Sequence, residues 1–108
     1  MRPMQEPLAD AISLPGVMAA LSDPARVQIV RALAGDGEVS CGTFELGVTK
    51  ATRSHHLRVL REAGLTHTRA EGTRRMVSLR RDELDARFPG LLDAILAAAE
   101  RDAPAPVT

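Results

Sequence analysis

The sequence has no tryptophan and no tyrosine, and Phe44 and Phe88 are its only aromatic residues. Without an aromatic platform on which unstacked bases could stack, RNA is a disfavoured ligand. Cys41 is the only cysteine, which excludes an intrachain disulfide. No apolar run approaches the roughly 20 residues that cross a bilayer, and the N-terminus lacks the apolar segment of a secretory signal. These absences predict a cytoplasmic protein that does not enter the membrane.

The chain also has no net charge, because 14 lysines and arginines balance 14 acidic residues. The charges are segregated, however: residues 1–49 carry −3, residues 50–81 carry +7 and residues 82–108 carry −4. A basic middle between acidic ends favours a polyanionic partner, and nucleic acid is the leading polyanion. Charge alone leaves the alternative open that the middle segment is only a solvated surface.

A chain of this length is expected to form a single domain over residues 1–108. Apolar residues at helical spacing predict a first helix over about residues 4–14, ended by Pro15. A second helix has Asp23 as its N-cap and Pro24 in its first position, and it stops at residues 35–37. Its predicted buried stripe consists of Val27, Val30, Leu33 and Ala34.

The next segment has the pattern of a helix-turn-helix. Ser40 can cap a short helix that continues through residues 44–46, and Gly47 can end it in a left-handed conformation. Thr49 then caps a helix predicted over about residues 50–63, which Gly64 stops. Its inward-facing residues are expected to be Leu57 and Leu60. Two helices joined by a glycine-containing turn form a helix-turn-helix.

Alternating residues then predict a β-hairpin over about residues 65–80, with its turn at residues 71–73. Because a two-stranded ribbon is marginal alone, it must pack against the helices as a wing. Pro89 suits the start of a last helix over residues 89–102, and the tail, residues 103–108, is expected to be disordered. The predicted fold class is mainly α with a small β-hairpin wing, a winged helix-turn-helix.

An α-helix fits the major groove of DNA, where side chains on its first turns reach base edges and phosphates. The helix predicted over residues 50–63 begins with short polar and cationic side chains suited to this. The expected DNA-binding residues there are Thr49, Lys50, Ala51, Thr52, Ser54 and His55, with Arg58 nearer a phosphate. On the hairpin, Arg69, Arg74 and Arg75 are expected to contact the flanking backbone or minor groove. The expected partner is therefore double-stranded DNA.

Three blocks in order, "ALSDPARVQIVRAL", "VTKATRSHHLRVLREAGL" and "RAEGTRRMVSL", carry a resemblance. Together they span about residues 17–80, and the combination strongly resembles the ArsR/SmtB group of bacterial winged-helix repressors. The resemblance implies that the helix with Ser-His-His-Leu is the recognition helix and that the first and last helices build a symmetric homodimer. It also implies a repressor on a pseudo-palindromic operator, released by an inducer.

The apolar stripes on the two terminal helices independently favour a dimer, because so short a chain lacks core enough to cover both. The expected dimer-interface residues are Leu8, Ile12, Leu91, Leu92, Ile95 and Leu96.

The sequence departs from the family pattern at Arg53, where the family commonly has a small apolar residue. Either the stem of Arg53 packs while its guanidinium reaches a carboxylate, or Arg53 is an extra phosphate ligand. His55 and His56 point about 100° apart on a helix, so one is expected to meet DNA while the other packs or caps.

Metal sites of the family use a Cys-x-Cys pair or Asp and His pairs on the C-terminal helices. Cys41 has no second thiolate beside it, and residues 82–102 contain no histidine. The sequence therefore predicts no family-type metal site and no cofactor, and it leaves the inducer unidentified. Cys41 is a candidate redox sensor if a helix N-terminus favours its thiolate; the alternative is a small buried apolar residue.

Two rival functions are open to the sequence. The first is a winged-helix module that binds protein and carries the same basic face. Its binding would depend only weakly on salt, whereas the affinity of a DNA-binding protein falls steeply as salt rises. A small hydrolase using Cys41 and a histidine lacks a recognisable orienting group or oxyanion hole, so the protein is not expected to be an enzyme.

Overall fold

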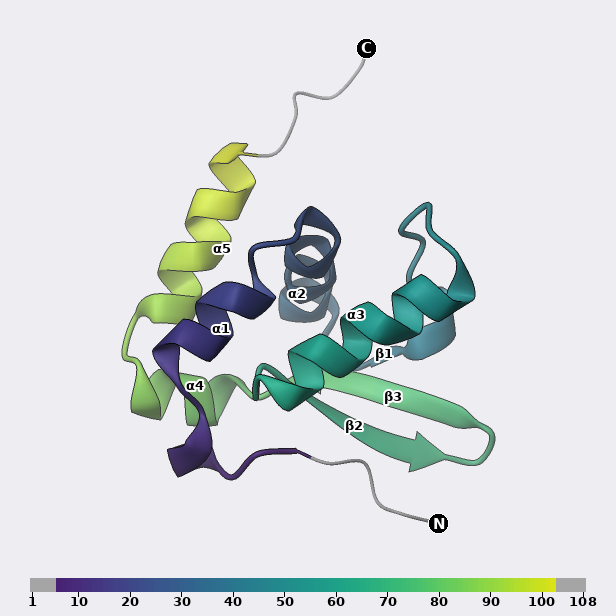
Figure 1. The fold of residues 1–108 in the computed structure, drawn as a ribbon, viewed down its shortest axis with the longest axis horizontal. Coiled ribbons are helices and arrows are strands. Elements are labelled where there is room, and N and C mark those ends of the chain that lie inside the picture. Colours follow the sequence, from purple (N-terminus) through teal and green to yellow (C-terminus); the bar gives the residue numbers. More distant parts are fainter. Residues whose placement is uncertain (1–5, 103–108) are drawn as a thin grey trace.

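The computed structural model describes residues 6–102, so the predictions for residues 4 and 5 and for the tail 103–108 lie outside the described part of the chain. A helical body carries a β-hairpin that projects from one side (Figure 1). In chain order, the elements are the 3-10 turn η1 (Ala9–Ala11), α1 (Leu14–Ala20), α2 (Pro24–Asp36), β1 (Val39–Ser40), the 3-10 turn η2 (Cys41–Thr43), α3 (Lys50–Glu62), β2 (Thr66–Glu71), β3 (Arg74–Leu79), α4 (Arg81–Arg87) and α5 (Leu91–Asp102).

The three strands form one antiparallel sheet in the order β1-β3-β2. β2 and β3 pair from Thr66 opposite Leu79 to Glu71 opposite Arg74, so only two residues make the turn between them. Gly72 adopts a φ of 60° there, which a residue without a Cβ reaches at little cost. β1 pairs with the other edge of β3, with Val39 opposite Val77. The predicted hairpin is thus confirmed and is extended by a short third strand.

The hydrophobic core draws on every helix and on the inner face of the sheet. Its most deeply buried side chains are Ile12, Val17, Ile29, Val30, Leu33, Leu60, Leu65 and Val77. α2 contacts α3, α5 and β3, so it is covered on more than one side. The predicted stripe on α2 is confirmed for Val30 and Leu33 but wrong for Ala34, which is exposed, while Ile29 is fully buried.

The N-terminal prediction of a helix ending at Pro15 is wrong, because Pro15 lies in the first turn of α1. The Ser13 hydroxyl accepts a hydrogen bond from the Gly16 N–H at 3.1 Å and caps the helix. Proline is tolerated in a first turn, where its missing N–H has no helical partner to lose. Before α1, the described part of the chain has only the three-residue turn η1.

The short helix expected through residues 44–46 is also wrong in extent. Only the 3-10 turn η2 forms, no side-chain hydrogen bond caps it from Ser40, and Phe44 is extended and buried. The left-handed Gly47 is confirmed, with a φ of 68°. Thr49 caps α3 as predicted, because its hydroxyl accepts a hydrogen bond from the Thr52 N–H at 3.2 Å.

The C-terminal region contains one helix that the sequence reading missed. α4 has seven residues, and Leu84 is its only buried side chain. The last helix begins at Leu91, two residues after the predicted start at Pro89, because Gly90 turns the chain with a φ of 80°. No helix within residues 6–102 is long and apolar enough to span a membrane.

Candidate nucleic-acid interface

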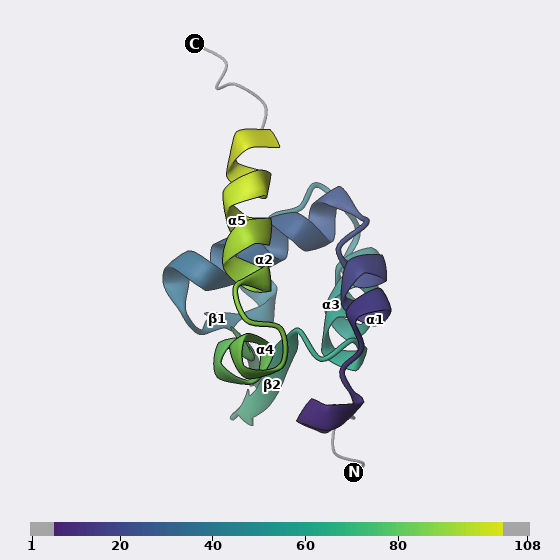
Figure 2. The same cartoon turned by 90° about the vertical axis from the view of Figure 1, so that its left-hand side faces the viewer.

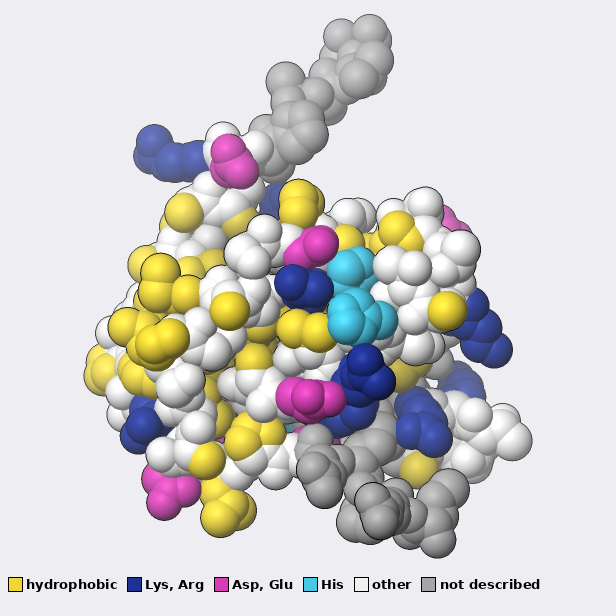
Figure 3. Space-filling model, viewed as in Figure 1, with side chains coloured by type: hydrophobic (Ala, Val, Ile, Leu, Met, Phe, Trp, Pro, Cys, Tyr) yellow, Lys and Arg dark blue, Asp and Glu magenta, His cyan; other side chains and the backbone are white. Residues whose placement is uncertain are grey.

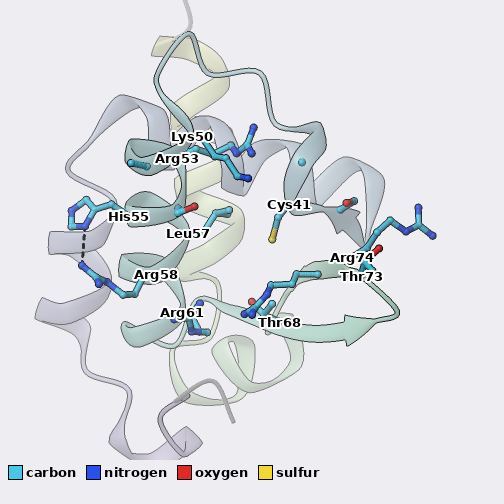
Figure 4. A pocket seen from close by; sticks show the side chains of 15 residues that line it. Cys41, Lys50, Arg53, His55, Leu57, Arg58, Arg61, Thr68, Thr73 and Arg74 are labelled. Carbon is cyan, nitrogen blue, oxygen red and sulfur yellow. Dashed lines mark hydrogen bonds between the residues drawn. The ribbon is translucent and has the colours of Figure 1, made fainter. Parts of the chain in front are cut away.

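An open groove of about 850 Å³ lies between α3 and the β2–β3 hairpin (Figure 4). Side chains from both elements and from η2 line it, and none of them is acidic. We call it the basic groove, after its six cationic residues: Lys50, Arg53, Arg58, Arg61, Arg74 and Arg75. Arg58 also forms an exposed ion pair with Glu62 at 3.6 Å, but Glu62 does not line the groove. Six cations in a lining without acidic residues create a positive potential suited to a polyanion.

The start of α3 presents the side chains predicted to read DNA. The Thr49 cap fixes where the helix begins, and the hydroxyl groups of Thr49 and Thr52 hydrogen-bond to each other at 3.0 Å. All of the residues predicted on this part of α3 are exposed, and most of them line the basic groove. Those that line it are Lys50, Ala51, Ser54, His55 and Arg58, and Arg74 and Arg75 join them from β3.

The two adjacent histidines of α3 have different surroundings. His56 is buried, and its Nδ1 accepts a hydrogen bond from Nη1 of Arg26 on α2 at 3.1 Å. His55 is exposed in the basic groove, with its Nδ1 3.3 Å from Nη2 of Arg58. The packing half of the prediction is therefore confirmed, and contact between His55 and DNA stays a prediction.

Arg69 does not join the other predicted site residues. Alternation along β2 places Thr68 in the basic groove and Arg69 on the opposite face. There the Arg69 guanidinium donates to both carboxylate oxygens of Glu38, at 2.8 and 2.6 Å, and to Glu71 at 2.9 Å. These carboxylates raise the pKa of Arg69. In this position Arg69 joins the hairpin to the segment before β1.

The ion pair between Arg69 and Glu38 gives a pH-dependent contribution to stability. The Arg69 guanidinium holds the pKa of Glu38 below its ordinary value of 4.5. A carboxyl group whose pKa is lower in the folded state stabilises the fold above its unfolded pKa, and this contribution is lost as the pH falls through the folded pKa. The stabilisation is therefore complete at neutral pH, begins to fall as the pH drops below 4.5 and is lost below the lower pKa of the folded state.

We expect Glu38→Gln to lower the melting temperature by only a few degrees near neutral pH, because exposed ion pairs contribute little. The difference from wild type should shrink as acid protonates Glu38. Thermal melts followed by circular dichroism across the acidic range measure it. Glu45→Gln is the matched control, since Glu45 is exposed and forms no ion pair within residues 6–102. A Glu38→Gln deficit that stayed constant into strong acid would contradict the assignment.

The comparisons with known proteins agree with this geometry. A family model described as a helix-turn-helix domain matches residues 21–69. The uncharacterized HTH-type transcriptional regulator YceK of Bacillus subtilis (strain 168) is 42% identical over 82 residues, which are 73% of this chain and 82% of that protein. The crystal structure of a possible transcriptional regulator for arsenical resistance has a TM-score of 0.58 at 29% identity, over 86% of this chain and 100% of that one.

A solved ArsR family transcriptional regulator has the same fold, with a TM-score of 0.56 at 20% identity over 94% of this chain and all of that one. The chain belongs to the ArsR family. The β2–β3 hairpin has the position of the wing in this fold, and α3 is the helix predicted to enter the major groove. Helix-turn-helix regulators bind double-stranded DNA, and the relatives are transcriptional regulators, a class without enzymatic activity.

The structure differs from two expectations, which concern Arg53 and Cys41. Arg53 forms no ion pair with any residue from 6 to 102, so the expected carboxylate partner is not seen and its guanidinium lies in the basic groove (Figure 4). Cys41 is half-buried, and burial raises the pKa of its thiol, which is opposite to the thiolate expected of a redox sensor. Within the described chain, no group of three or more His, Cys, Asp or Glu could hold a metal ion.

The dimer-interface predictions need correction at two positions. Ile12 and Leu92 are buried in the core of the chain itself, with exposed fractions of 1% and 3%, so neither offers surface to a partner. Leu8 is exposed, while Leu91, Ile95 and Leu96 are half-buried. Met18 was missed because it lies in a helix that the sequence reading ended too early, and its exposed fraction is 60%.

Apolar side chains gather on the side of the molecule away from the hairpin (Figure 3), where α1 and α5 lie (Figures 1 and 2). Six apolar residues from α1, its C-cap, α2 and α5 line a shallow groove of about 400 Å³ there, together with Asp102. We call this surface the apolar face, formed by Met18, Leu21, Val27, Ile95, Ala98 and Ala99.

Proposed function

We propose that this ArsR-family regulator binds DNA sequence-specifically as a homodimer on a pseudo-palindromic operator, where it represses transcription until a signal releases it. The observation that carries the proposal is the basic groove, in which six cations and no carboxylate lie beside the exposed start of the recognition helix. Phosphates neutralise such a cluster, and a duplex is the polyanion that a helix of this size fits.

We expect base contacts and phosphate contacts to have different roles in recognition. The short side chains of Thr52 and Ser54 on the first turns of α3 can reach base edges in the major groove, and they supply sequence preference. Lys50, Arg58 and Arg74 are cations at the sides of the same surface, suited to phosphates. Such contacts supply affinity that does not depend on sequence.

A homodimer is supported by the apolar face. Met18 on α1 exposes an unbranched apolar side chain next to the half-buried Ile95 on α5, and exposed apolar surface of this kind is typical of association sites. A two-fold dimer through α1 and α5 leaves the basic groove of each protomer free, because α3 and the hairpin, which line that groove, lie away from α5 (Figure 1). Two recognition helices related by a two-fold axis match a pseudo-palindromic operator.

Repression and release by a signal are supported by the family resemblance. The apolar face could also mediate release of the dimer from the operator. A ligand that favours a different arrangement of the two protomers changes the spacing between the recognition helices. The two half-sites are then no longer contacted together.

The test is fluorescence anisotropy of a labelled duplex from the region upstream of the protein's own gene, compared with a scrambled duplex at two salt concentrations. We expect affinity that prefers the native duplex and falls steeply with salt. Arg74→Ala should weaken binding to both duplexes and reduce the slope of log affinity against log salt by about one unit per contacted phosphate. Arg101→Ala, which changes an exposed arginine at the far end of α5, is the matched control.

Substitution of Thr52 or Ser54 should instead change the preference between duplexes. If the Arg74 and Thr52 variants changed affinity and preference in the same way, the division of roles would be wrong. Binding that is insensitive to salt would favour the protein-interaction alternative.

A further inference from the structure

The inner end of the basic groove has features that base reading by the start of α3 does not explain. It lies where the second half of α3 faces β2, with Arg61 on one side and Thr68 on the other (Figure 4). Arg53 lies about two turns closer to the start of α3. We call this part the inner site, formed by Arg53, Arg61 and Thr68. Cys41 lies beside it, with its sulfur directed into the groove (Figure 4).

The guanidinium of Arg61 has an unused donor at the inner site. Its Nε atom is buried and has no hydrogen-bond partner. Neither Arg61 nor Arg53 forms an ion pair with any carboxylate in residues 6–102, whereas Arg69, Arg80 and Arg81 all do. A buried, charged donor without an acceptor is costly, so a small rotation of the Arg61 side chain toward a ligand that supplies oxygen acceptors is favoured.

Positive charge from two elements converges on the same place. Arg53 and Arg61 on α3 and Arg75 on β3 all act electrostatically on the Cys41 thiol and oppose the effect of its burial. Thr68, which is largely buried, provides a hydroxyl group on the wing side. Guanidinium groups with a hydroxyl are the donor set that binds phosphate oxygens.

We propose that the inner site binds an oxyanion of the phosphate class, held by Arg61 and Arg53 with the Thr68 hydroxyl as a further donor. The phosphate comes from one of two sources, a phosphodiester of the DNA strand that passes between α3 and the wing, or a free phosphate compound. The first source rests on the proposed function, and the second does not. With either source, Arg53 and Arg61 are ligand-binding residues of the basic groove.

Cys41 provides a direct probe, because it is the only cysteine and lies beside the inner site. An oxyanion bound there disfavours the thiolate, which is the reactive form, and covers the sulfur. We expect inorganic pyrophosphate, at constant ionic strength, to slow alkylation of Cys41 by neutral iodoacetamide roughly threefold or more. The protection should be saturable, and chloride should not reproduce it.

The variants show whether the arginines form the site. Arg61→Gln and Arg53→Gln should each remove protection by pyrophosphate, and Arg101→Gln should keep it. Arg61→Lys retains the charge but lacks the Nε donor, so it should protect only partly. Thermal melts establish which variants fold, and Arg53→Gln serves if Arg61→Gln does not fold. Equal protection in Arg61→Gln, Arg53→Gln and wild type would overturn the proposal.

A second arm replaces pyrophosphate with the upstream duplex. Protection of Cys41 by the duplex, with competition from pyrophosphate, identifies the DNA backbone as the source. If the duplex binds without protecting Cys41 while pyrophosphate still protects, the source is a free phosphate compound. If no duplex binds but pyrophosphate protects in an Arg61-dependent manner, the inner site is supported and the proposed function fails. If the duplex binds and neither ligand protects, the inner site is overturned and the proposed function stands.

Discussion

Gly64→Ala should destabilise the protein by about 3 kcal/mol, the sum of a backbone cost and a steric cost. Gly64 turns the chain after α3 with a φ of 86°, where an L side chain is strained. A Cβ there would also lie 2.7 Å from Cδ1 of the fully buried Ile12. Because Ile12 is held in the core, it cannot move aside cheaply.

Gly47→Ala is the matched control for this prediction. Gly47 has a similar φ of 68°, but a Cβ there would meet no atom within 4 Å. It should therefore show the backbone cost alone, about 1–2 kcal/mol. The free energy of unfolding from denaturant titration measures both variants. If Gly64→Ala were no worse than Gly47→Ala, the close packing between Ile12 and the end of α3 would be wrong.

If the protein is the proposed homodimer, Met18→Asp should give a folded monomer and lower its affinity for the upstream duplex by roughly 100-fold, because a monomer loses the effective concentration that links two half-sites. Met18 is 60% exposed in the single chain, so an aspartate there has access to water and the protomer stays folded. In a dimer through the apolar face, the same carboxylate would be buried without a partner, which is costly.

Sedimentation velocity measures the mass of the Met18→Asp variant, and circular dichroism shows that it is folded. Val48→Asp is the control for oligomeric state, since Val48 is also an exposed apolar residue, 43% accessible, but lies in the turn before α3. A Met18→Asp variant that sedimented as a normal dimer would exclude α1 from the interface.

Helix α3 could be predicted from the sequence because its signals are local. Thr49 as the cap, the inward Leu57 and Leu60 and the glycine stop all lie within one stretch of chain, and the structure confirms them. The cations of the basic groove could be predicted for the same reason, since most of them lie in α3 itself. Local pattern suffices where one element carries both the structure and the chemistry.

The N-terminal helix was mispredicted because proline has two opposite meanings. Pro15 can stop a helix or sit in its first turn, and the choice depends on whether Ser13 caps. α4 was missed because Leu84 is its only buried residue, so its sequence has no apolar period to detect.

Burial could not be predicted wherever distant segments decide it. Ile12 and Leu92 are apolar residues on terminal segments, and no local signal shows whether they face the core or a second protomer. Arg69 is equally ambiguous, because its contact with Glu38 joins positions 31 residues apart. The inner site was missed for a similar reason, since Arg61 and Thr68 meet only after the wing folds back on α3.

The pairing of β1 with β3 has a consequence for how the protein is made. Val39 lies opposite Val77, so the loop that this pairing closes contains the whole recognition helix. The wing hairpin turns over two residues and closes fast, whereas β1 must join across a long loop, which is slower. On the ribosome, α3 therefore emerges before β3, the strand with which β1 pairs. A nascent chain that stops short of Val77 carries the residues predicted to read DNA but lacks the complete sheet.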